Sequence, residues 1–321
     1  MKDFAGKIAV ITGGGTGIGR ELARRLVAER CNVAMCSRSV EAMAETKRLC
    51  ELERPAQDVC VTTHVADVSV EDQIKRFRDE LAEQQATDKI HLLFNNAGVS
   101  GGGSLFTSTR EDWERTFNIC WGGVHLGVRT FLPMLMKADE GHIVNTSSIA
   151  GFWGVSAGLN ASHTAYVTAK FAVKGFTEAM INDLRLHAPH IKCSVVMPGY
   201  VGTPIVLNSR KAQSGADRLL DDEVALLRKQ GVEVDKMSEQ ELQTLAAERA
   251  RRYIEEAPTT AAQAATAILD GVKAGKWRIL VGADAQKLDE RVRRDPELAY
   301  THEFYKSVAE EVGWRSIWST A

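Results

Sequence analysis

Short, nearly uninterrupted apolar runs alternate along the chain with longer stretches in which apolar residues recur every three or four positions. The short runs are typical of buried parallel strands, and the longer stretches, such as residues 19–29 and 71–84, are typical of amphipathic helices. This alternation predicts an α/β fold, with a doubly wound parallel sheet of seven strands and helices on both faces. The predicted strands are residues 7–12, 32–37, 59–65, 90–95, 141–147, 192–198 and 277–282.

The alternation is interrupted after residue 204 by a highly charged stretch. Within it, residues 238–257 open with a Ser238-x-x-Glu241 capping box and predict an amphipathic helix. We interpret residues 1–321 as a single domain that contains a helical insertion or lid at 205–257 and a C-terminal helical extension at 283–321. Periodicity leaves open whether the apolar stripe of the predicted helix covers a substrate or a neighbouring subunit. The stripe consists of Leu242, Leu245, Ala246 and Ala250.

Composition narrows the classes of partner. The formal net charge is −2 and the pI is near 6.5, so bulk charge gives no attraction to nucleic acid or to an acidic membrane surface. No apolar run is long enough to span a membrane, and the six cysteines form no metal-binding or disulfide pattern. We therefore expect a soluble, cytoplasmic protein without a metal site, whose partners are small molecules or copies of itself.

The first predicted strand leads into the glycine-rich turn TGGGTGIGR, residues 12–20. Glycines at 13, 17 and 19 precede a predicted helix, whose first turn offers unpaired N–H groups and the positive end of a dipole. The position after the first strand predicts a dinucleotide site, although the same turn could serve only as a tight connection between strand and helix.

A second candidate for chemistry is the pair Tyr166 and Lys170, which lie one turn apart on a predicted helix. Reduction of a carbonyl requires a proton for the developing alkoxide, and a phenol with a pKa of about 10 is a poor acid/base near neutral pH. A neighbouring ammonium would favour the phenolate and lower that pKa. Taken alone the Tyr-x-x-x-Lys pattern is weak, because it also arises by chance.

The order and spacing of several motifs together resemble the short-chain dehydrogenase/reductase family. These motifs are Thr-Gly-x-x-x-Gly-Ile-Gly at 12–19, NNAG at 95–98, Ser148, Tyr166-x-x-x-Lys170 and PGYVGT at 198–203, so the resemblance covers residues 6 to about 204. It implies a Rossmann-like fold and hydride transfer with a nicotinamide cofactor. It further implies a catalytic set of four residues, in which Tyr166 is the acid/base, Ser148 rather than Ser147 binds the substrate oxygen, Lys170 also binds the cofactor ribose, and Asn118 supports a water chain to Lys170.

The end of the second predicted strand indicates the form of the cofactor. An acidic residue there would bind a ribose 2′-hydroxyl, whereas this chain has Ser37, Arg38 and Ser39, which favour the 2′-phosphate of NADP(H) over NAD(H). An exposed, solvated Arg38 is the alternative. The resemblance implies the following cofactor-binding residues: Gly13, Thr16, Gly17, Ile18, Gly19, Ser37, Arg38, Ser39, Asp67, Val68, Asn95, Ala97, Gly98, Tyr166, Lys170, Pro198, Gly199, Val201 and Thr203.

Tyr166 lies eighteen positions after Ser148, a longer spacing than is usual in the family, and we expect the loop between them to shape the substrate pocket. An apolar or aromatic substrate would suit this loop, although its aromatic residues could equally pack the loop onto the protein. His163 could touch the substrate or could have a surface or capping role. The candidate substrate-pocket residues are Phe152, Trp153, Leu159 and Tyr200.

We predict an NADP(H)-dependent oxidoreductase that interconverts a secondary alcohol and a ketone, or an alcohol and an aldehyde, of a fairly apolar, aromatic or alicyclic substrate. The alternatives are an NAD(H)-preferring dehydrogenase, a catalytically idle nucleotide-sensing scaffold, and a different chemistry on the same sheet, such as methyl transfer. The resemblance also implies a homodimer or homotetramer formed through residues 111–136 and 164–188, where small side chains at Ala169, Ala172 and Gly175 would allow close helix approach.

Overall fold

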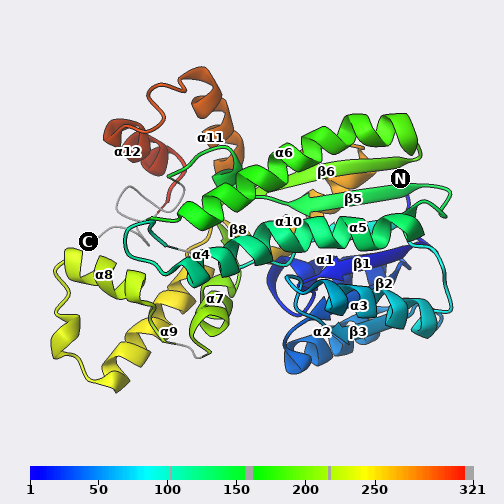
Figure 1. Cartoon of the computed structure of the whole chain (residues 1–321), viewed down its shortest axis with the longest axis horizontal. Helices are drawn as coiled ribbons and strands as arrows, with labels where there is room; N and C mark the ends of the chain where they lie inside the picture. Colours follow the sequence, from blue (N-terminus) through cyan, green and yellow to red (C-terminus); the bar gives the residue numbers. More distant parts are fainter. Residues whose placement is uncertain (102, 156–161, 216–217, 315–321) are drawn as a thin grey trace.

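The computed structural model describes residues 1–101, 103–155, 162–215 and 218–314. A seven-stranded parallel sheet forms its centre, in the order β3-β2-β1-β4-β5-β6-β9 (Figure 1). The predicted fold class is therefore confirmed, and each predicted strand corresponds to a strand of this sheet. The strands are β1 (Ile8–Thr12), β2 (Asn32–Ser37), β3 (Val61–Val65), β4 (Leu92–Asn95), β5 (Gly141–Thr146), β6 (Ile191–Pro198) and β9 (Arg278–Val281).

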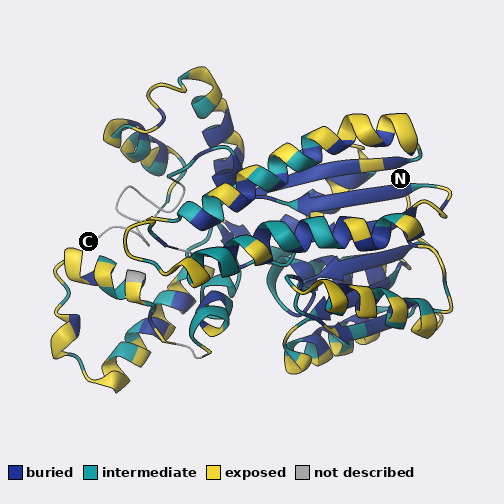
Figure 2. Ribbon diagram, viewed as in Figure 1, coloured by how far each residue is buried: buried dark blue, intermediate teal, exposed yellow. Residues whose placement is uncertain are grey.

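Helices cover both faces of the sheet, and the strands between them are almost entirely buried (Figure 2). On one face the apolar sides of the first, second and tenth helices pack together, and the third, fifth and sixth helices pack on the other. The chain thus folds as a three-layer α/β/α sandwich. These helices are α1 (Gly17–Ala28), α2 (Val40–Glu53), α3 (Glu71–Gln84), α5 (Gly123–Leu135), α6 (Thr164–His187) and α10 (Ala261–Lys273).

The strand order reverses at β1, which pairs with β2 on one side and with β4 on the other. The chain segments that leave β1 and β4 therefore diverge to opposite faces and leave a crevice at the carboxyl ends of the strands. In Figure 1 this is the left end of the sheet, opposite the N-terminus, and both additional helical segments lie beside it.

The predicted insertion contains helices α7 (Ile205–Ser214), α8 (Asp221–Lys229) and α9 (Glu239–Glu255), and one turn at Val234–Lys236. The capping box is present, because the Ser238 hydroxyl accepts from the Glu241 N–H and the Glu241 carboxylate accepts from the Ser238 N–H at 2.7 Å. Three residues of the apolar stripe of α9, Leu242, Leu245 and Ala246, pack inside the insertion. They belong to a small cluster whose other members include Leu219, Leu227 and Val234.

The C-terminal extension forms α11 (Ala283–Arg294) and α12 (His302–Glu311), as its periodicity predicts. Trp153 is fully buried against this extension, where it contacts the rings of Phe304 and Tyr305, and its indole N–H donates to the Ala299 carbonyl at 2.7 Å. The prediction that Trp153 lines the substrate pocket is therefore wrong, because its ring instead forms the core that attaches the extension.

Phe152 belongs to the same apolar cluster and is also absent from the residues that line the pocket in the described part of the chain. The prediction that Phe152 lines the substrate pocket is therefore wrong as well. The third candidate, Leu159, lies outside the described residues. The loop from Ser148 toward Tyr166 thus uses both of its described aromatic candidates for packing.

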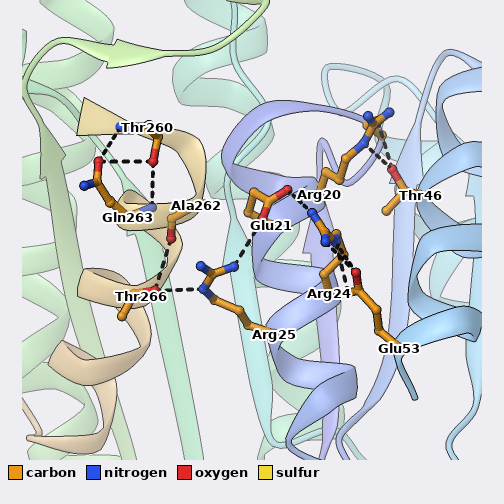
Figure 3. Close-up of polar contacts among 11 residues, drawn as sticks. Arg20, Glu21, Arg24, Arg25, Thr46, Glu53, Thr260, Ala262, Gln263 and Thr266 are labelled. Carbon is orange, nitrogen blue, oxygen red and sulfur yellow. Dashed lines mark hydrogen bonds and ion pairs between the residues drawn. The ribbon is translucent and has the colours of Figure 1, made fainter. Parts of the chain in front are cut away.

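Polar contacts fix α1 between α2 and α10 (Figure 3). The Arg20 guanidinium donates to the Gly15 carbonyl at 2.8 Å and to the Thr46 hydroxyl at 3.0 Å, and Arg25 donates to Thr266 at 2.8 Å. The glycine-rich turn is thereby tied to the helix that follows β2. Among the described residues, no helix combines the length and the hydrophobicity needed to cross a membrane.

Candidate active site

A pocket of about 780 Å³ opens at the carboxyl ends of the strands, where the topology places the crevice. Its walls come from the turns that follow β1, β2, β4, β5 and β6, and from the insertion and the C-terminal segment. Most of the predicted cofactor residues line it: Gly13, Thr16, Gly17, Ile18, Ser37, Arg38, Ser39, Asp67, Val68, Ala97, Gly98, Tyr166, Lys170, Pro198, Gly199, Val201 and Thr203.

The glycine-rich turn has the geometry of a pyrophosphate cradle. Gly13 and Gly17 have φ angles of 69° and 54°, and a Cβ at Gly13 would lie 2.8 Å from the Ala97 Cα, so a larger residue would be strained there. Helix α1 begins at Gly17 with no side-chain cap and no acidic residue in its first turn. Its first N–H groups and the positive end of its dipole are therefore available to an anion, and the residues present fit a dinucleotide.

Gly19 has a different role from the other two glycines. It does not line the pocket among the described residues, and a Cβ at this position would lie 2.2 Å from the Gly13 carbonyl oxygen. The predicted cofactor contact at Gly19 is thus replaced by close packing between the turn and the helix.

The residues after β2 lie where the adenosine end of a dinucleotide would be bound. Ser37, Arg38 and Ser39 line the pocket, and the Arg38 guanidinium lies 3.9 Å from a carboxylate oxygen of Asp67. The Ser39 hydroxyl accepts from an N–H of α2 and donates to the Glu41 carboxylate at 3.0 Å. The half-exposed Arg38 guanidinium thus lies beside the Asp67 carboxylate at this end of the pocket.

Asn95 does not contact the pocket, contrary to the prediction. Its side chain is buried and its amide donates to the Asn145 side chain at 2.8 Å, which in turn donates to the Thr177 hydroxyl at 3.0 Å. Asn95 therefore joins β4 to β5 inside the core. The second asparagine of NNAG, Asn96, lines the pocket instead, and its backbone N–H donates to the Thr12 hydroxyl at 3.0 Å.

Ser148, Tyr166 and Lys170 converge at one wall of the pocket. The Ser148 side chain lies close enough to the Tyr166 hydroxyl to affect the pKa of its phenol, and the Lys170 ammonium lies 5.4 Å from the centre of the Tyr166 ring and donates to the Thr146 carbonyl at 2.9 Å. Ser147 is engaged elsewhere, because its buried hydroxyl donates to the Lys170 carbonyl at 2.7 Å. The geometry thus distinguishes the two adjacent serines.

Burial dominates the electrostatics of this group. Burial raises the pKa of the Tyr166 phenol well above its ordinary value, and the hydrogen bond from Ser148 only partly opposes the effect. Burial also lowers the pKa of the Lys170 ammonium. Tyr166 is therefore a protonated phenol at neutral pH, and Lys170 is not among the causes that shift its pKa, contrary to the expectation.

Asn118 differs from the other three members of the predicted catalytic set in its exposure. Its side chain is exposed and does not line the pocket, whereas the next residue, Ile119, does. Asn118 opens a five-residue π-helical turn, Asn118–Gly122, and its carbonyl accepts from the Gly123 N–H. Such turns shift the register of a helix by one residue and often occur near functional sites.

Sequence reasoning missed two aromatic residues of the pocket, Tyr253 from α9 and Trp314 from the C-terminal segment. Both are joined to the predicted pocket residue Tyr200. The Tyr200 hydroxyl donates to the Tyr253 carbonyl at 2.6 Å, while the Tyr200 N–H at 2.7 Å and the Trp314 indole N–H at 3.1 Å donate to the buried Asp284 carboxylate. Asp284 thus joins the PGYVGT turn to the extension.

His163 lines the pocket at the start of α6 and makes no side-chain cap to that helix. Its capping role is therefore excluded. Burial lowers the pKa of its imidazole to about 4, and the Glu223 carboxylate opposes the shift in part. At neutral pH the imidazole carries no charge. Within the described residues, no group of three His, Cys, Asp or Glu side chains could hold a metal ion.

Comparison with known proteins decides the family. Residues 7–214 match the family described as short chain dehydrogenase. The chain belongs to the short-chain dehydrogenase/reductase family. It is 32% identical over 293 residues to the protein named "Putative oxidoreductase SadH" of Mycobacterium tuberculosis, covering 91% of this chain and 92% of the relative.

Two further members of the family resemble it. Levodione reductase of Leifsonia aquatica is 32% identical over 209 residues, which are 65% of this chain and 74% of that protein. The crystal structure of a short-chain dehydrogenase/reductase from Burkholderia phymatum in complex with NAD superposes with a TM-score of 0.73 at 28% identity, covering 93% of this chain and 96% of that one. The chain is therefore an oxidoreductase of this family, whose members act on CH–OH groups with NAD(P).

Proposed function

We propose that this protein is an NADP(H)-dependent oxidoreductase that interconverts a secondary alcohol and a ketone of an apolar, aromatic or alicyclic compound. The observation that carries the proposal is the convergence of Ser148, Tyr166 and Lys170 at the wall of the pocket that holds the glycine-rich turn. The support of a water chain to Lys170 by Asn118 stays a prediction, because the exposed Asn118 side chain is not among the residues that line the pocket.

The nicotinamide, when bound, supplies the hydride for reduction or accepts it in oxidation. In reduction the Tyr166 hydroxyl donates its proton to the substrate oxygen, and in oxidation the Tyr166 phenolate removes the proton from the alcohol. The Ser148 hydroxyl donates a hydrogen bond to the same oxygen and stabilises the charge that develops there. The Lys170 ammonium stabilises the phenolate after the proton has left.

Arg38 supports the preference for NADP(H). Its half-exposed guanidinium, with the hydroxyls of Ser37 and Ser39 beside it, offers charge-assisted donors to a 2′-phosphate. A preference for NAD(H) is the second candidate. It is favoured by the hydrogen bond between Ser39 and the Glu41 carboxylate, whose charge would repel a phosphate, and by the NAD bound in the Burkholderia phymatum relative.

The test is a titration of the purified protein with NADPH and NADH, followed by nicotinamide fluorescence, and then an assay of α-tetralone and other aromatic and alicyclic ketones. Tyr166→Phe should keep its cofactor affinity and lose roughly 100-fold or more in kcat, because general acid catalysis contributes on the order of 100- to 10,000-fold. Ser147→Ala is the control. It removes the hydroxyl that donates to the Lys170 carbonyl and so reports the effect of a structural change in this wall of the pocket. Turnover by Tyr166→Phe at the parent rate would reject the assignment.

A further inference from the structure

The pocket contains a second tyrosine whose hydroxyl the reaction does not use. Tyr253 lies near the end of α9 and lines the same pocket as Tyr166. The two side chains are close enough that charge on one raises the pKa of the other. A substrate oxygen held at Tyr166 therefore leaves the remainder of the molecule within reach of Tyr253.

Tyr253 is held firmly although it belongs to the insertion. Its carbonyl accepts from the Tyr200 hydroxyl at 2.6 Å, and the two rings contact each other with centroids 4.8 Å apart at an angle of 51°. Tyr200 is fixed in turn by the bond from its N–H to Asp284. The Tyr253 ring is thus positioned from both its backbone and its face.

The hydroxyl of Tyr253, in contrast, has no hydrogen-bond partner within the described residues. The half-buried Tyr253 side chain lines the pocket, so a ligand there can supply the hydrogen-bond partner of this hydroxyl. Burial raises the pKa of this phenol, which therefore stays neutral and can both donate and accept. His163, which is neutral, and the Trp314 ring line the same pocket, and the Asp284 carboxylate disfavours negative charge at Tyr253, so a neutral oxygen function suits this position better than a carboxylate.

We infer that Tyr253 is a specificity-determining residue that binds a second oxygen function, a hydroxyl or a carbonyl, on the apolar frame of the substrate. The inference rests on the proposed function and narrows its substrate class from simple ketones to hydroxyketones and diketones, or the corresponding diols. The reacting oxygen lies at Ser148 and Tyr166, the second oxygen at Tyr253, and the apolar frame between them contacts Trp314.

The test measures binding, so that it does not depend on turnover. The Tyr166→Phe protein is titrated by calorimetry, with and without NADPH, with α-tetralone and with its ring-hydroxylated derivatives. We expect at least one hydroxylated derivative to bind about tenfold more tightly than α-tetralone, the gain from one hydrogen bond of about 1.4 kcal/mol. Adding Tyr253→Phe should abolish this advantage and leave the affinity for α-tetralone unchanged.

Tyr305→Phe is the matched control, because it removes a phenol hydroxyl that lies in the cluster around Trp153 and outside the pocket lining. The Tyr305→Phe variant should still bind the hydroxylated derivative more tightly than α-tetralone. The inference is overturned if no hydroxylated derivative gains affinity, if the gain survives Tyr253→Phe, or if both compounds lose affinity equally. A failure of the proposed function would be seen in different experiments. The protein would then bind neither nucleotide, or its turnover would not depend on Tyr166.

Discussion

At the scale of single residues, this site separates neighbours that look equivalent in the sequence. Ser147 and Ser148 are adjacent in the sequence, yet the Ser147 hydroxyl donates to a carbonyl of α6, whereas the Ser148 side chain lies beside the phenol of Tyr166. Asn95 and Asn96 divide in the same way between the core and the pocket. Side chains point to opposite sides of an extended backbone, so a shift of one residue exchanges a structural role for a functional one.

Arg38 is predicted to decide the cofactor preference. Arg38→Asp should weaken NADPH binding by roughly tenfold or more, because it replaces a phosphate-binding cation by a repelling carboxylate, and should improve NADH binding through the ribose 2′-hydroxyl. Fluorescence titration with both nucleotides measures the change. Arg48→Asp makes the same charge reversal on α2 at an arginine that pairs with Glu45 and should leave the preference unaltered. If Arg38→Asp also leaves the cofactor preference unaltered, residues other than Arg38 bind the 2′-phosphate.

His163 should make the protein sensitive to acid. Its pKa is about 4 in the folded protein against an ordinary value of 6.5, so between these two pH values the unfolded chain binds a proton that the folded protein excludes. The free energy of unfolding therefore falls as the pH falls through this window and is unaffected by His163 above it. Melting temperatures should drop between about pH 7 and about pH 5, and the drop should be smaller in His163→Gln. His187→Gln, at an exposed histidine, is the control; an equal drop in both variants contradicts the prediction.

At the scale of elements, helix α11 supports the turn that follows β6 through one buried carboxylate. Asp284 lies in the first turn of α11, where the helix dipole stabilises its charge, and it accepts from the N–H groups of Tyr200, Trp314 and Ala285. A Cβ at Gly199 would lie 2.2 Å from one of its oxygens, so the turn after β6 packs directly on this carboxylate. The extension is therefore part of the pocket and not an appendage.

Asp284→Asn should weaken cofactor binding as well as stability. An amide presents an NH₂ group where the carboxylate accepts an N–H, which costs about 1–3 kcal/mol and displaces the Gly199–Tyr200 turn. We expect a lower melting temperature and a loss of about tenfold in NADPH affinity. Asp289→Asn is the control on the same helix, since Asp289 is also buried but pairs with Arg278 and Arg293. It should lower the melting temperature alone, and an identical affinity loss in both variants would refute a specific role for Asp284.

At the scale of the whole molecule, we propose a homodimer or homotetramer whose subunits pair through α6 and its neighbours. Large apolar side chains are exposed on α6, with Phe171 42% and Ile181 39% accessible. The small residues predicted to allow close approach divide between two faces, because Ala169 is buried in the subunit's own core whereas Gly175 is open on its outer side. Only the outward-facing part of that predicted set can contact a partner.

Phe171→Glu should therefore shift the protein toward monomers, because a charge replaces apolar surface at the contact. Sedimentation velocity at several protein concentrations measures the shift. Leu52→Glu introduces the same charge at a more exposed leucine, 71% accessible at the end of α2, and should leave the assembly intact. A monomeric parent protein, or an assembly that both substitutions leave unchanged, would contradict the proposed interface.

The sequence by itself determined the sheet, the crevice and most of the cofactor wall. Strand runs, helix periods and the turn glycines are local patterns, and each carries its own physical reason in a few consecutive residues. The capping box at Ser238 and the glycines at 13 and 17 were predictable for this reason. Tyr166 and Lys170 could be paired because one helix turn fixes their separation.

Only the tertiary structure decided what surrounds the substrate. Trp153 turns into the core of the C-terminal extension, Asn118 is exposed at the start of a π-helical turn, and most of the stripe of α9 packs within the insertion. Tyr253 and Trp314 reach the pocket from segments far from Tyr166 in the chain. No local pattern encodes such contacts, because they depend on which distant segments pack together. The packing of distant segments is decided by the free energy of burying apolar surface over the whole chain.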